Sequence, residues 1–283
     1  MAHGAVIVTG SSSGIGRATA LHLDRLGFRV FAGVREPEDG EALAERARGA
    51  LEPLIVDVTQ QSTIDAALAR VSDAIGDGGL AGLVNNAGTA GGAPLELLPE
   101  AELRRQFDVN FFGAVAMTQA FLPLLRQARG RIVNISSIGG RSASPGFGAY
   151  NASKFALEAA SDVFRLELHP WGIHVAVIEP GSIATDIWDS GIKTTDRLTE
   201  QMPQGKRKLY DPMIAAVRAA VESTAAEGIP PEEVAKRIEH ALTAERPRTR
   251  YLVGRDAKIR AIVSAVLPDR AMDALIRRLM KLN

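Results

Sequence analysis

The chain has 283 residues, of which 46% are hydrophobic and 23% charged, and its formal net charge is zero. This composition is typical of a globular protein with a sizeable core, and the neutral balance gives no sign of a nucleic-acid partner or an anionic membrane. The sequence has no cysteine, which excludes disulfides, thiolate catalysis and cysteine-based metal sites. Because residues 1–4 are not a basic region leading into a long apolar stretch, we expect a cytoplasmic protein.

Short apolar runs alternate along the chain with longer segments of helical periodicity. Predicted strands cover residues 5–8, 28–34, 54–56, 80–84, 131–135 and 173–178; predicted helices cover residues 15–26, 62–75, 99–121 and 150–168, with a polar segment at 38–48. This alternation predicts an α/β fold, a doubly wound parallel sheet of the Rossmann type, because each crossover must be long and right-handed. In such sheets ligands bind beyond the carboxyl ends of the strands.

The alternation of strands and helices breaks after Pro180. We expect a single domain over residues 1–283, in which residues 182–228 form a substrate-covering insertion with helical pieces. A last strand is predicted at residues 250–253, followed by an amphipathic helical extension over residues 255–283. We expect the extension to pack on the core or on a partner subunit, with attachment to a membrane surface as the less favoured alternative. The basic residues 206–208 are expected on the solvated face of the insertion.

A glycine-rich loop, residues 9–16, lies between the first strand and the first helix. Its sequence, TGSSSGIG, spaces the glycines as Gly-x3-Gly-x-Gly rather than the common Gly-x-Gly-x-x-Gly. Glycines let the backbone turn tightly and let a phosphate approach, while the helix N-terminus offers unpaired N–H groups and a positive dipole end. The loop therefore indicates a pyrophosphate site, although a plain strand-to-helix turn can have the same composition.

The same loop also matches the Gly-x-Ser-x-Gly pattern of serine hydrolases, with Ser12 as the nucleophile. Hydrolases of that kind have an oxyanion-hole loop upstream, and only residues 1–9 precede the pattern here. Their triad also needs a histidine late in the core on a strand-end loop, whereas His240 is predicted to lie within a helix. A serine hydrolase is kept as the alternative enzyme class.

Tyr150 and Lys154 place a phenol and an ammonium four residues apart on one face of a predicted helix. A phenol titrates near pH 10, and a neighbouring cation lowers its pKa toward the range of useful acid/base chemistry. Ser137 ends the fifth predicted strand, where its hydroxyl can hold a substrate oxygen. Asn110 lies within a helix among apolar neighbours, which indicates a buried amide with partners. A surface pair, a turn serine and a solvated helix residue are the plain structural alternatives.

Taken in order, these motifs resemble those of the short-chain dehydrogenase/reductase family over about residues 5 to 185. Residues 9–16 resemble the family's cofactor loop, and residues 85–88 resemble its NNAG motif. The resemblance implies a catalytic tetrad of Asn110, Ser137, Tyr150 and Lys154. The cofactor-binding residues that it implies are Gly10, Ser12, Ser13, Gly14, Ile15, Gly16, Arg35, Asp57, Val58, Asn86, Ala87, Gly88, Tyr150, Lys154, Pro180, Gly181, Ile183 and Thr185.

The resemblance implies hydride transfer between a nicotinamide cofactor and a carbonyl compound or alcohol. Tyr150 would exchange a proton with the substrate oxygen, and Lys154 would lower the pKa of Tyr150 and bind the nicotinamide ribose. Ser137 would orient the substrate oxygen, and Asn110 would hold a water that links Lys154 to solvent. No metal is required, and the sequence offers no cluster of His, Asp and Glu to bind one.

The cofactor preference depends on the end of the second predicted strand. An acidic residue there binds the ribose 2′-hydroxyl of NAD, whereas an arginine accommodates the 2′-phosphate of NADP. The family's discriminating acid falls at Val34, and Arg35 follows it, so we expect NADP(H) to be favoured over NAD(H). Glu36 keeps NAD(H) open, because it lies about twenty residues past the glycine loop, the usual distance for a ribose-binding acid.

Residues 31–35 and the long C-terminal tail resemble the branch of the family that contains 17β-hydroxysteroid and retinol dehydrogenases. This resemblance implies a sizeable apolar alcohol or ketone as the small-molecule substrate, with no nucleic-acid partner. It also implies a homodimer formed through the helices around Asn110 and Tyr150, with a tetramer as an alternative. A non-catalytic dinucleotide sensor is the third functional class, and the presence of both Tyr150 and Lys154 argues against it.

Overall fold

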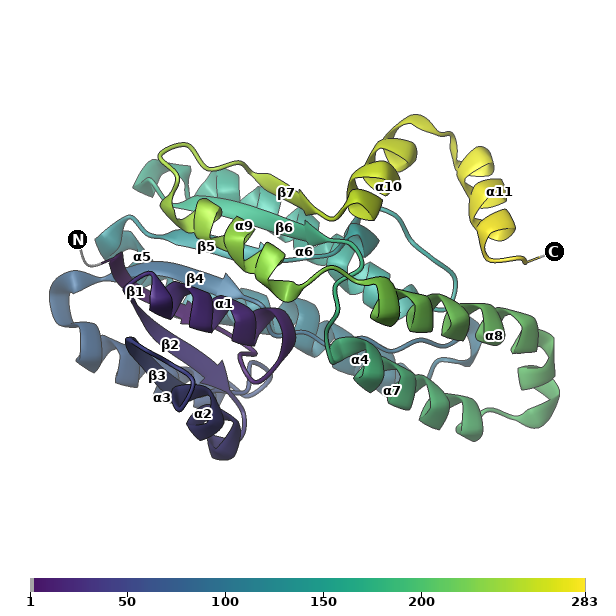
Figure 1. Cartoon of the computed structure of the whole chain (residues 1–283), viewed down its shortest axis with the longest axis horizontal. Helices are drawn as coiled ribbons and strands as arrows, with labels where there is room; N and C mark the ends of the chain where they lie inside the picture. Colours follow the sequence, from purple (N-terminus) through teal and green to yellow (C-terminus); the bar gives the residue numbers. More distant parts are fainter. Residues whose placement is uncertain (1–2, 283) are drawn as a thin grey trace.

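The computed structural model describes the backbone of residues 3–282, and the side chains of all of these except residues 3, 189 and 224–226. Residues 1–2 and 283, at the ends of the predicted domain, lie outside the described residues. A parallel sheet of seven strands, in the order β3-β2-β1-β4-β5-β6-β7, forms the centre (Figure 1). The strands are β1 (His3–Val8), β2 (Phe28–Val34), β3 (Ala50–Ile55), β4 (Leu80–Asn85), β5 (Arg131–Ile135), β6 (His174–Pro180) and β7 (Arg250–Val253). The predicted Rossmann-type fold is confirmed.

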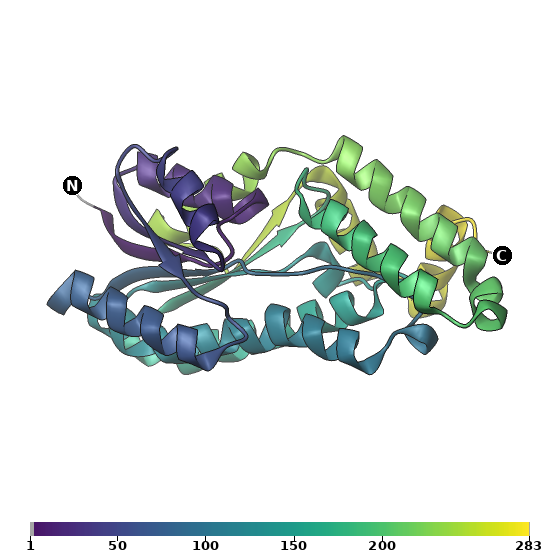
Figure 2. The same cartoon turned by 90° about the horizontal axis from the view of Figure 1, so that it is seen from below.

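Helices cover both faces of the sheet (Figure 2). One face carries α1 and α9, which pack on each other, and the opposite face carries α3, α5 and α6. The helices are α1 (Gly14–Arg25), α2 (Pro37–Ala44), α3 (Gln61–Ile75), α4 (Glu100–Phe107), α5 (Gly113–Ala128), α6 (Gly148–Glu167), α7 (Ile187–Gln201), α8 (Gln204–Glu227), α9 (Pro231–Thr243), α10 (Arg255–Val266) and α11 (Asp269–Leu279).

The central strands are apolar throughout because both of their faces are buried. In β1, Val6 and Val8 belong to the core beneath α1 and α9, while Ile7 belongs to the core beneath α3 and α5. All three side chains are fully buried. Side chains of a strand alternate between its two faces, so one apolar run contributes to both cores.

The third strand differs from its prediction. It covers Ala50–Ile55 and pairs with β2 in register from Arg29↔Ala50 to Val34↔Ile55, whereas the apolar run predicted residues 54–56. The strand lies at the edge of the sheet, where its residues alternate between buried and exposed, and it contains Pro53, which an edge strand tolerates. A strand of this kind has no continuous apolar run, and this is why its first half was missed.

The long predicted helix at residues 99–121 is present but interrupted. Its first part, α4, passes through a π-helical segment, Asp108–Phe112, before continuing as α5. Among the described helices, the run Glu100–Ala128 alone has the length and apolar composition needed to cross a membrane. Phe121 and Leu125 of this run are fully buried in the core beneath the sheet.

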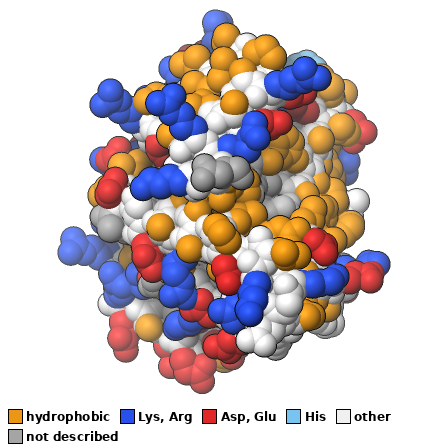
Figure 3. Space-filling model, turned by 90° about the vertical axis from the view of Figure 1, so that its right-hand side faces the viewer, with side chains coloured by type: hydrophobic (Ala, Val, Ile, Leu, Met, Phe, Trp, Pro, Cys, Tyr) orange, Lys and Arg blue, Asp and Glu red, His pale blue; other side chains and the backbone are white. Residues whose placement is uncertain are grey.

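The segments beyond the carboxyl edge of the sheet are helical. Helices α7 and α8 follow β6 and pack on each other, and α10 and α11 follow β7 (Figure 1). Helix α10 is anchored by Ala257 and Ala261, which are buried beside Ile138, whereas none of the described residues of α11 is buried. Figure 3 shows this end of the molecule, where hydrophobic side chains lie among lysines and arginines.

Candidate active site

The glycine loop after β1 is shaped by three positions that need glycine. Gly10 and Gly14 have φ of +64° and +51°, in the left-handed region that other residues rarely adopt. Gly16 is required by space, because a Cβ there would lie 2.0 Å from the carbonyl oxygen of Gly10. No described side chain caps the N-terminus of α1, so its N–H groups are available to an anion.

The glycine loop crosses the loop that follows β4, residues 85–88. The Asn86 side-chain Nδ2 donates to the carbonyl oxygens of Thr9 (2.9 Å) and Gly10 (3.0 Å). The Thr9 hydroxyl in turn accepts from the backbone N–H groups of Asn86 and Ala87, both at 3.0 Å. These four hydrogen bonds lock the two loops together and hold the start of α1 at the carboxyl edge of the sheet.

A cavity of about 360 Å³ opens between these loops, the end of β6 and the start of α7. Of the residues predicted to bind a cofactor or to react, only Gly16 and Asn110 are not among its described lining residues; Gly16 lies under the glycine loop and Asn110 is 1% exposed. The predicted residues that line it are Gly10, Ser12, Ser13, Gly14, Ile15, Arg35, Asp57, Val58, Asn86, Ala87, Gly88, Ser137, Tyr150, Lys154, Pro180, Gly181, Ile183 and Thr185.

At one end of the cavity lie the ends of β2 and β3. Arg35 is exposed there, directly after the buried Val34. The Asp57 carboxylate is fixed by Thr59, whose backbone N–H and hydroxyl both donate to Asp57 Oδ1, at 2.9 and 2.8 Å. A guanidinium and an oriented carboxylate therefore face the same end of the cavity.

At the opposite end, Ser137 and Tyr150 come together. Ser137 follows β5 and its hydroxyl accepts from the N–H of Gly139 at 3.0 Å; Tyr150 lies in the first turn of α6. A Cβ placed on Gly139 would lie 3.3 Å from Ser137 Oγ and 3.4 Å from Tyr150 Cε1, so both side chains pack around this glycine. Asn151 Nδ2 donates to the carbonyl of Gly139 at 2.9 Å and ties the serine turn to the tyrosine helix.

Lys154 and Asn110 lie behind this pair. The Lys154 ammonium is buried, donates to the carbonyl oxygen of Ile135 at 2.8 Å and lies 5.9 Å from the centroid of the Tyr150 ring. A Cβ placed on Gly88 would lie 3.4 Å from Asn110 Oδ1 and 3.7 Å from Lys154 Nζ, so the amide and the ammonium flank the same glycine. The structure thus brings all four predicted catalytic residues to one end of the cavity.

Burial dominates the titration of the tyrosine and lysine. It raises the pKa of Tyr150 above its ordinary value, and the hydrogen bond with Ser137 offsets this only in part. Burial likewise lowers the pKa of Lys154 to about 8, against the opposing effect of the Glu158 carboxylate. The predicted lowering of the Tyr150 pKa by Lys154 is not seen in this structure: burial raises this pKa, and the contact that lowers it is the hydrogen bond with Ser137.

Two residues that hold Asn110 were missed in the sequence. Asn110 Nδ2 donates to the Thr89 carbonyl (2.9 Å) and to Ser153 Oγ (3.0 Å), while Asn110 Oδ1 accepts from the Thr89 N–H at 2.8 Å. Ser153 Oγ in turn donates to the carbonyl oxygen of Tyr150 at 2.8 Å. Ser153 could have been suspected from its place in the sequence between Tyr150 and Lys154. Thr89 offered no indication in the sequence beyond following the NNAG segment.

A buried ionic cluster behind the site was also missed. Glu158 and Glu179 are 7% and 0% exposed, and Arg250 Nε reaches both carboxylates, at 3.1 and 3.3 Å. Asp162 accepts from Arg250 at 2.8 Å, and Arg141 lies 3.4 Å from Glu179. Burial, and then the charge of Glu158, raise the pKa of Glu179 to about 7, and the two arginines counteract this only in part.

The model of the short chain dehydrogenase family matches residues 4–196 of this chain. The chain belongs to that family. Retinol dehydrogenase 5 of Mus musculus is 38% identical to this short-chain dehydrogenase over 277 residues, which cover 96% of the chain and 87% of that protein. Estradiol 17-beta-dehydrogenase 2 of Mus musculus is 37% identical over 286 residues, covering 97% of the chain and 74% of that protein. The predicted family and its steroid and retinol branch are confirmed.

Solved structures of short-chain dehydrogenases share this fold. One from Streptomyces avermitilis matches with a TM-score of 0.78 at 30% identity, covering 98% of this chain and 94% of that one. One from Burkholderia cenocepacia J2315 in complex with NADP matches with a TM-score of 0.73 at 27% identity, covering 98% and 97%. The protein is accordingly an NAD(P)-dependent oxidoreductase of this family, as the motifs predicted.

The alternative reading of Ser12 as a hydrolase nucleophile finds no support. Ser12 is exposed in the glycine loop, and no described histidine bonds to it: His22 pairs with Glu239, and His240 Nδ1 lies 2.9 Å from the Tyr251 hydroxyl. Membership of the short chain dehydrogenase family also argues against acyl transfer at Ser12.

Glu179 makes folding stability depend on pH. Its pKa is raised to about 7 in the folded chain from an ordinary value of 4.5, so the stability that it contributes is complete below pH 4.5 and is lost as pH rises through 7. Glu179→Gln stays neutral at every pH. Between pH 5 and pH 8 we expect its free energy of unfolding to rise by about 3 kcal/mol relative to that of the wild type, because one pKa unit corresponds to about 1.4 kcal/mol. Urea unfolding across this pH range measures the difference. Glu167→Gln, at an exposed position, is the control, and a pH-independent difference for Glu179→Gln would contradict the assignment.

Proposed function

We propose that this chain transfers hydride between NADP(H) and the carbonyl or alcohol group of a sizeable apolar molecule, with Tyr150 as the general acid/base. The observation that carries the proposal is the convergence of Ser137, Tyr150 and Lys154 at one end of a cavity of about 360 Å³, with Asn110 directly behind them. The glycine loop and the exposed Arg35 line the rest of that cavity. This combination provides both a place for a dinucleotide and a proton donor beside it.

The residues present fit a nicotinamide dinucleotide. The N-terminus of α1, with no capping side chain among the described residues, suits the pyrophosphate, and Gly10, Gly14 and Gly16 leave room for it. Asp57 suits the adenine end, and the ends of β5 and β6 suit the nicotinamide end. When bound, the cofactor supplies or accepts the hydride.

The chain's own residues move the proton. In the reducing direction the Tyr150 hydroxyl donates its proton to the substrate oxygen, and in the oxidising direction the phenolate accepts it. Ser137 orients the substrate oxygen through its hydroxyl, whose second function as acceptor for Gly139 fixes its position. Lys154, with its pKa lowered to about 8, exchanges protons near neutral pH, and Asn110 keeps the adjoining backbone of Thr89 in place.

Two observations support an apolar substrate. The lid, which we define as residues 182–228 with helices α7 and α8, contributes Ile187 and Trp188 to the cavity wall, which Ala90 also lines. Retinol dehydrogenase 5 and estradiol 17-beta-dehydrogenase 2 are relatives along almost the whole of this chain, and their names specify apolar alcohols. We therefore place the apolar part of the substrate beneath the lid and its oxygen between Ser137 and Tyr150.

Replacing Tyr150 with Phe removes the proton donor and keeps the ring. We expect kcat to fall by about 10²–10⁴-fold while NADPH binding is retained, since general acid/base groups contribute this much. Steady-state kinetics on a panel of retinoids, steroids and long-chain ketones measures it. Tyr210→Phe is the matched control, because the Tyr210 hydroxyl binds Glu96 at the surface. A folded wild type that binds NADPH but converts nothing in the panel would favour the sensor reading instead.

The preference for NADP(H) over NAD(H) follows from the end of β2. Val34 is buried there and has no polar group to offer a ribose 2′-hydroxyl, whereas the exposed Arg35 lines the cavity. A guanidinium pairs with a phosphate through parallel hydrogen bonds. Glu36, the residue that kept NAD(H) open, is not among the residues lining the cavity, within the part of the chain that the structure describes.

Arg35→Asp tests the cofactor preference. We expect NADPH affinity to fall by about tenfold or more and NADH affinity to change less, because only the charge-assisted contact to the 2′-phosphate is lost. Trp188 lines the cavity, so intrinsic fluorescence reports binding of either nucleotide. Arg46→Asp at an exposed site controls for the change in net charge. An equal loss of affinity for both nucleotides in Arg35→Asp would contradict the assignment.

We also propose a homodimer that forms through the helices on the α5–α6 side. Large apolar side chains are exposed there, including Phe155 (43%), Val163 (51%) and Leu166 (69%) on α6 and Phe112 (56%) before α5. We expect light scattering at micromolar concentration to give twice the chain mass, and Leu166→Asp to give a folded monomer, because burying a new charge disfavours the interface. A monomeric wild type would refute the proposal, and a tetramer would show that a second interface exists.

A further inference from the structure

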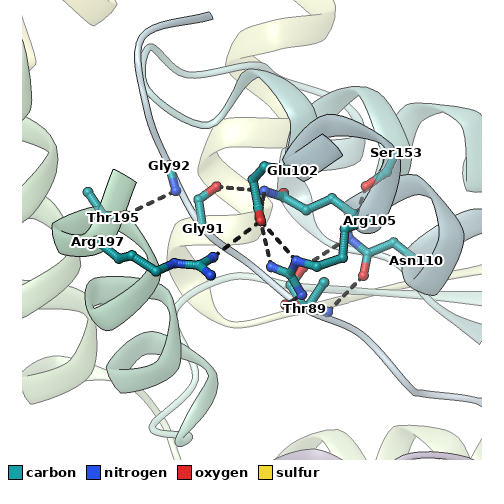
Figure 4. Close-up of polar contacts among 10 residues, drawn as sticks. Thr89, Gly91, Gly92, Glu102, Arg105, Asn110, Ser153, Thr195 and Arg197 are labelled. Atoms are coloured by element: carbon teal, nitrogen blue, oxygen red, sulfur yellow. Dashed lines mark hydrogen bonds and ion pairs between the residues drawn. The ribbon is translucent and has the colours of Figure 1, made fainter. Parts of the chain in front are cut away.

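A single buried carboxylate, Glu102 of α4, binds two arginines from different parts of the molecule (Figure 4). Glu102 is 5% exposed; Arg105 reaches it with Nε at 2.9 Å and Nη2 at 2.7 Å, and Arg197 approaches it at 3.6 Å. Gln106 adds a hydrogen bond of 2.9 Å from its side-chain amide. A carboxylate this buried persists only because its partners compensate for the lost hydration.

One arginine belongs to the lid. Arg197 is on α7, and the same helix makes a second polar contact two residues earlier, where Thr195 Oγ1 accepts from the N–H of Gly92 at 3.1 Å. Thr194 packs on the same loop, because a Cβ placed on Gly91 would lie 2.8 Å from its Cγ2. Helix α7 therefore docks on α4 and on the loop after β4 through several adjacent contacts.

The other arginine belongs to the catalytic side. Arg105 lines the cavity, and its Nη1 donates to the Thr89 hydroxyl at 3.2 Å. The backbone of Thr89 makes two hydrogen bonds with the Asn110 side chain, which continues through Ser153 to the carbonyl of Tyr150. Figure 4 shows this run of contacts from Arg197 through Glu102 and Arg105 to Asn110 and Ser153.

We propose that Glu102 is a positioning residue that holds the lid and the Thr89–Asn110 side of the catalytic site in one arrangement, through Arg197 and Arg105. The proposal rests on the function proposed above for this cavity. It gives Glu102 two separate effects: docking of α7 sets how well the lid covers the substrate, and the hold on Arg105 sets the position of the backbone that carries Asn110.

Apolar packing also attaches the lid to the rest of the molecule. Leu198 of α7 and Met202, directly after the helix, are buried with Ala93, so apolar packing anchors the helix independently of the ion pair. Arg197 is 59% exposed, and a pair with one exposed partner contributes modestly to stability. Loss of Arg197 is therefore expected to loosen the lid while the fold stays intact, which makes the effect measurable in a folded enzyme.

The test compares Glu102→Gln and Arg197→Gln with Glu100→Gln. Glu100 pairs with Arg104 on the solvent side of the same helix, with both side chains more than 70% exposed (73% and 74%), so it matches the charge change without touching the lid. A lysine-specific endoprotease under native conditions reports lid opening at Lys193, Lys206 and Lys208, which every variant keeps, and kinetics reports kcat and KM. Thermal unfolding and NADPH binding show whether each variant is folded and cofactor-competent.

We expect Arg197→Gln to be nicked in the lid about five- to tenfold faster than the wild type, since proteolysis follows the population of the open form. Its KM for the apolar substrate should rise about threefold or more with kcat within twofold, the pattern of lost substrate binding. Glu102→Gln should show the same changes and a kcat lowered by about tenfold, because it also releases Arg105. The double variant should match Glu102→Gln alone.

Nicking and KM in Arg197→Gln equal to those of Glu100→Gln would overturn the proposal, even if Glu102→Gln proved unstable. Additive effects in the double variant would overturn it as well, since the two residues would then act separately. Nicking by the lysine-specific protease does not require turnover. A wild type without activity would therefore refute the proposed function, while an unchanged nicking rate in an active enzyme would refute the role of Glu102 alone.

Discussion

The loops after β1 and β4 cross so closely that a Cβ on Gly10 would lie 2.8 Å from the Cα of Ala87. The sheet order brings these two loops together, since β1 and β4 are neighbours and the strand order reverses between them. Gly16 leaves space for the carbonyl of Gly10, and Asn86 supplies the hydrogen bonds that would otherwise be missing there. The start of α1 and the position of the cavity follow from this crossing.

The catalytic side shows how burial and reactivity are linked. Lys154 is 5% exposed, and its ammonium donates to the carbonyl oxygen of Ile135. An ammonium in such a place is weakly compensated, and this lowers its pKa toward neutrality. Behind it, Glu158, Glu179 and Arg250 form a cluster in which one arginine reaches two buried carboxylates. Glu179 of this cluster directly precedes Pro180 and Gly181, which line the cavity at the end of β6.

The parts of the structure visible in the sequence are those with a local pattern. A local pattern depends on neighbouring residues alone. The apolar runs of β1 and β4 therefore predicted the sheet, and the spacing from Ser137 to Lys154 predicted the site residues that meet at its edge. The first half of β3 was missed because an edge strand alternates and here includes Pro53. Contacts between distant segments left no local signal: Glu102 and Arg197 are far apart in the chain, and each reads as an ordinary helix-surface charge. The direction of the Tyr150 pKa shift was missed because burial is a property of the folded site.

The π-helical segment Asp108–Phe112 has a consequence for how this helix tolerates changes in length. A π turn uses more residues than an α turn to advance around the axis, so α4 and α5 are joined with a residue to spare. Removing one residue from the segment would allow an ordinary α-helical turn, with Glu102 and Phe121 still facing their present neighbours. The loss would fall on Asn110, whose amide would point elsewhere. The wide turn thus separates what the core needs from what the site needs: a shortened helix would still pack, while side chains of the segment that face the site, Asn110 among them, would change direction.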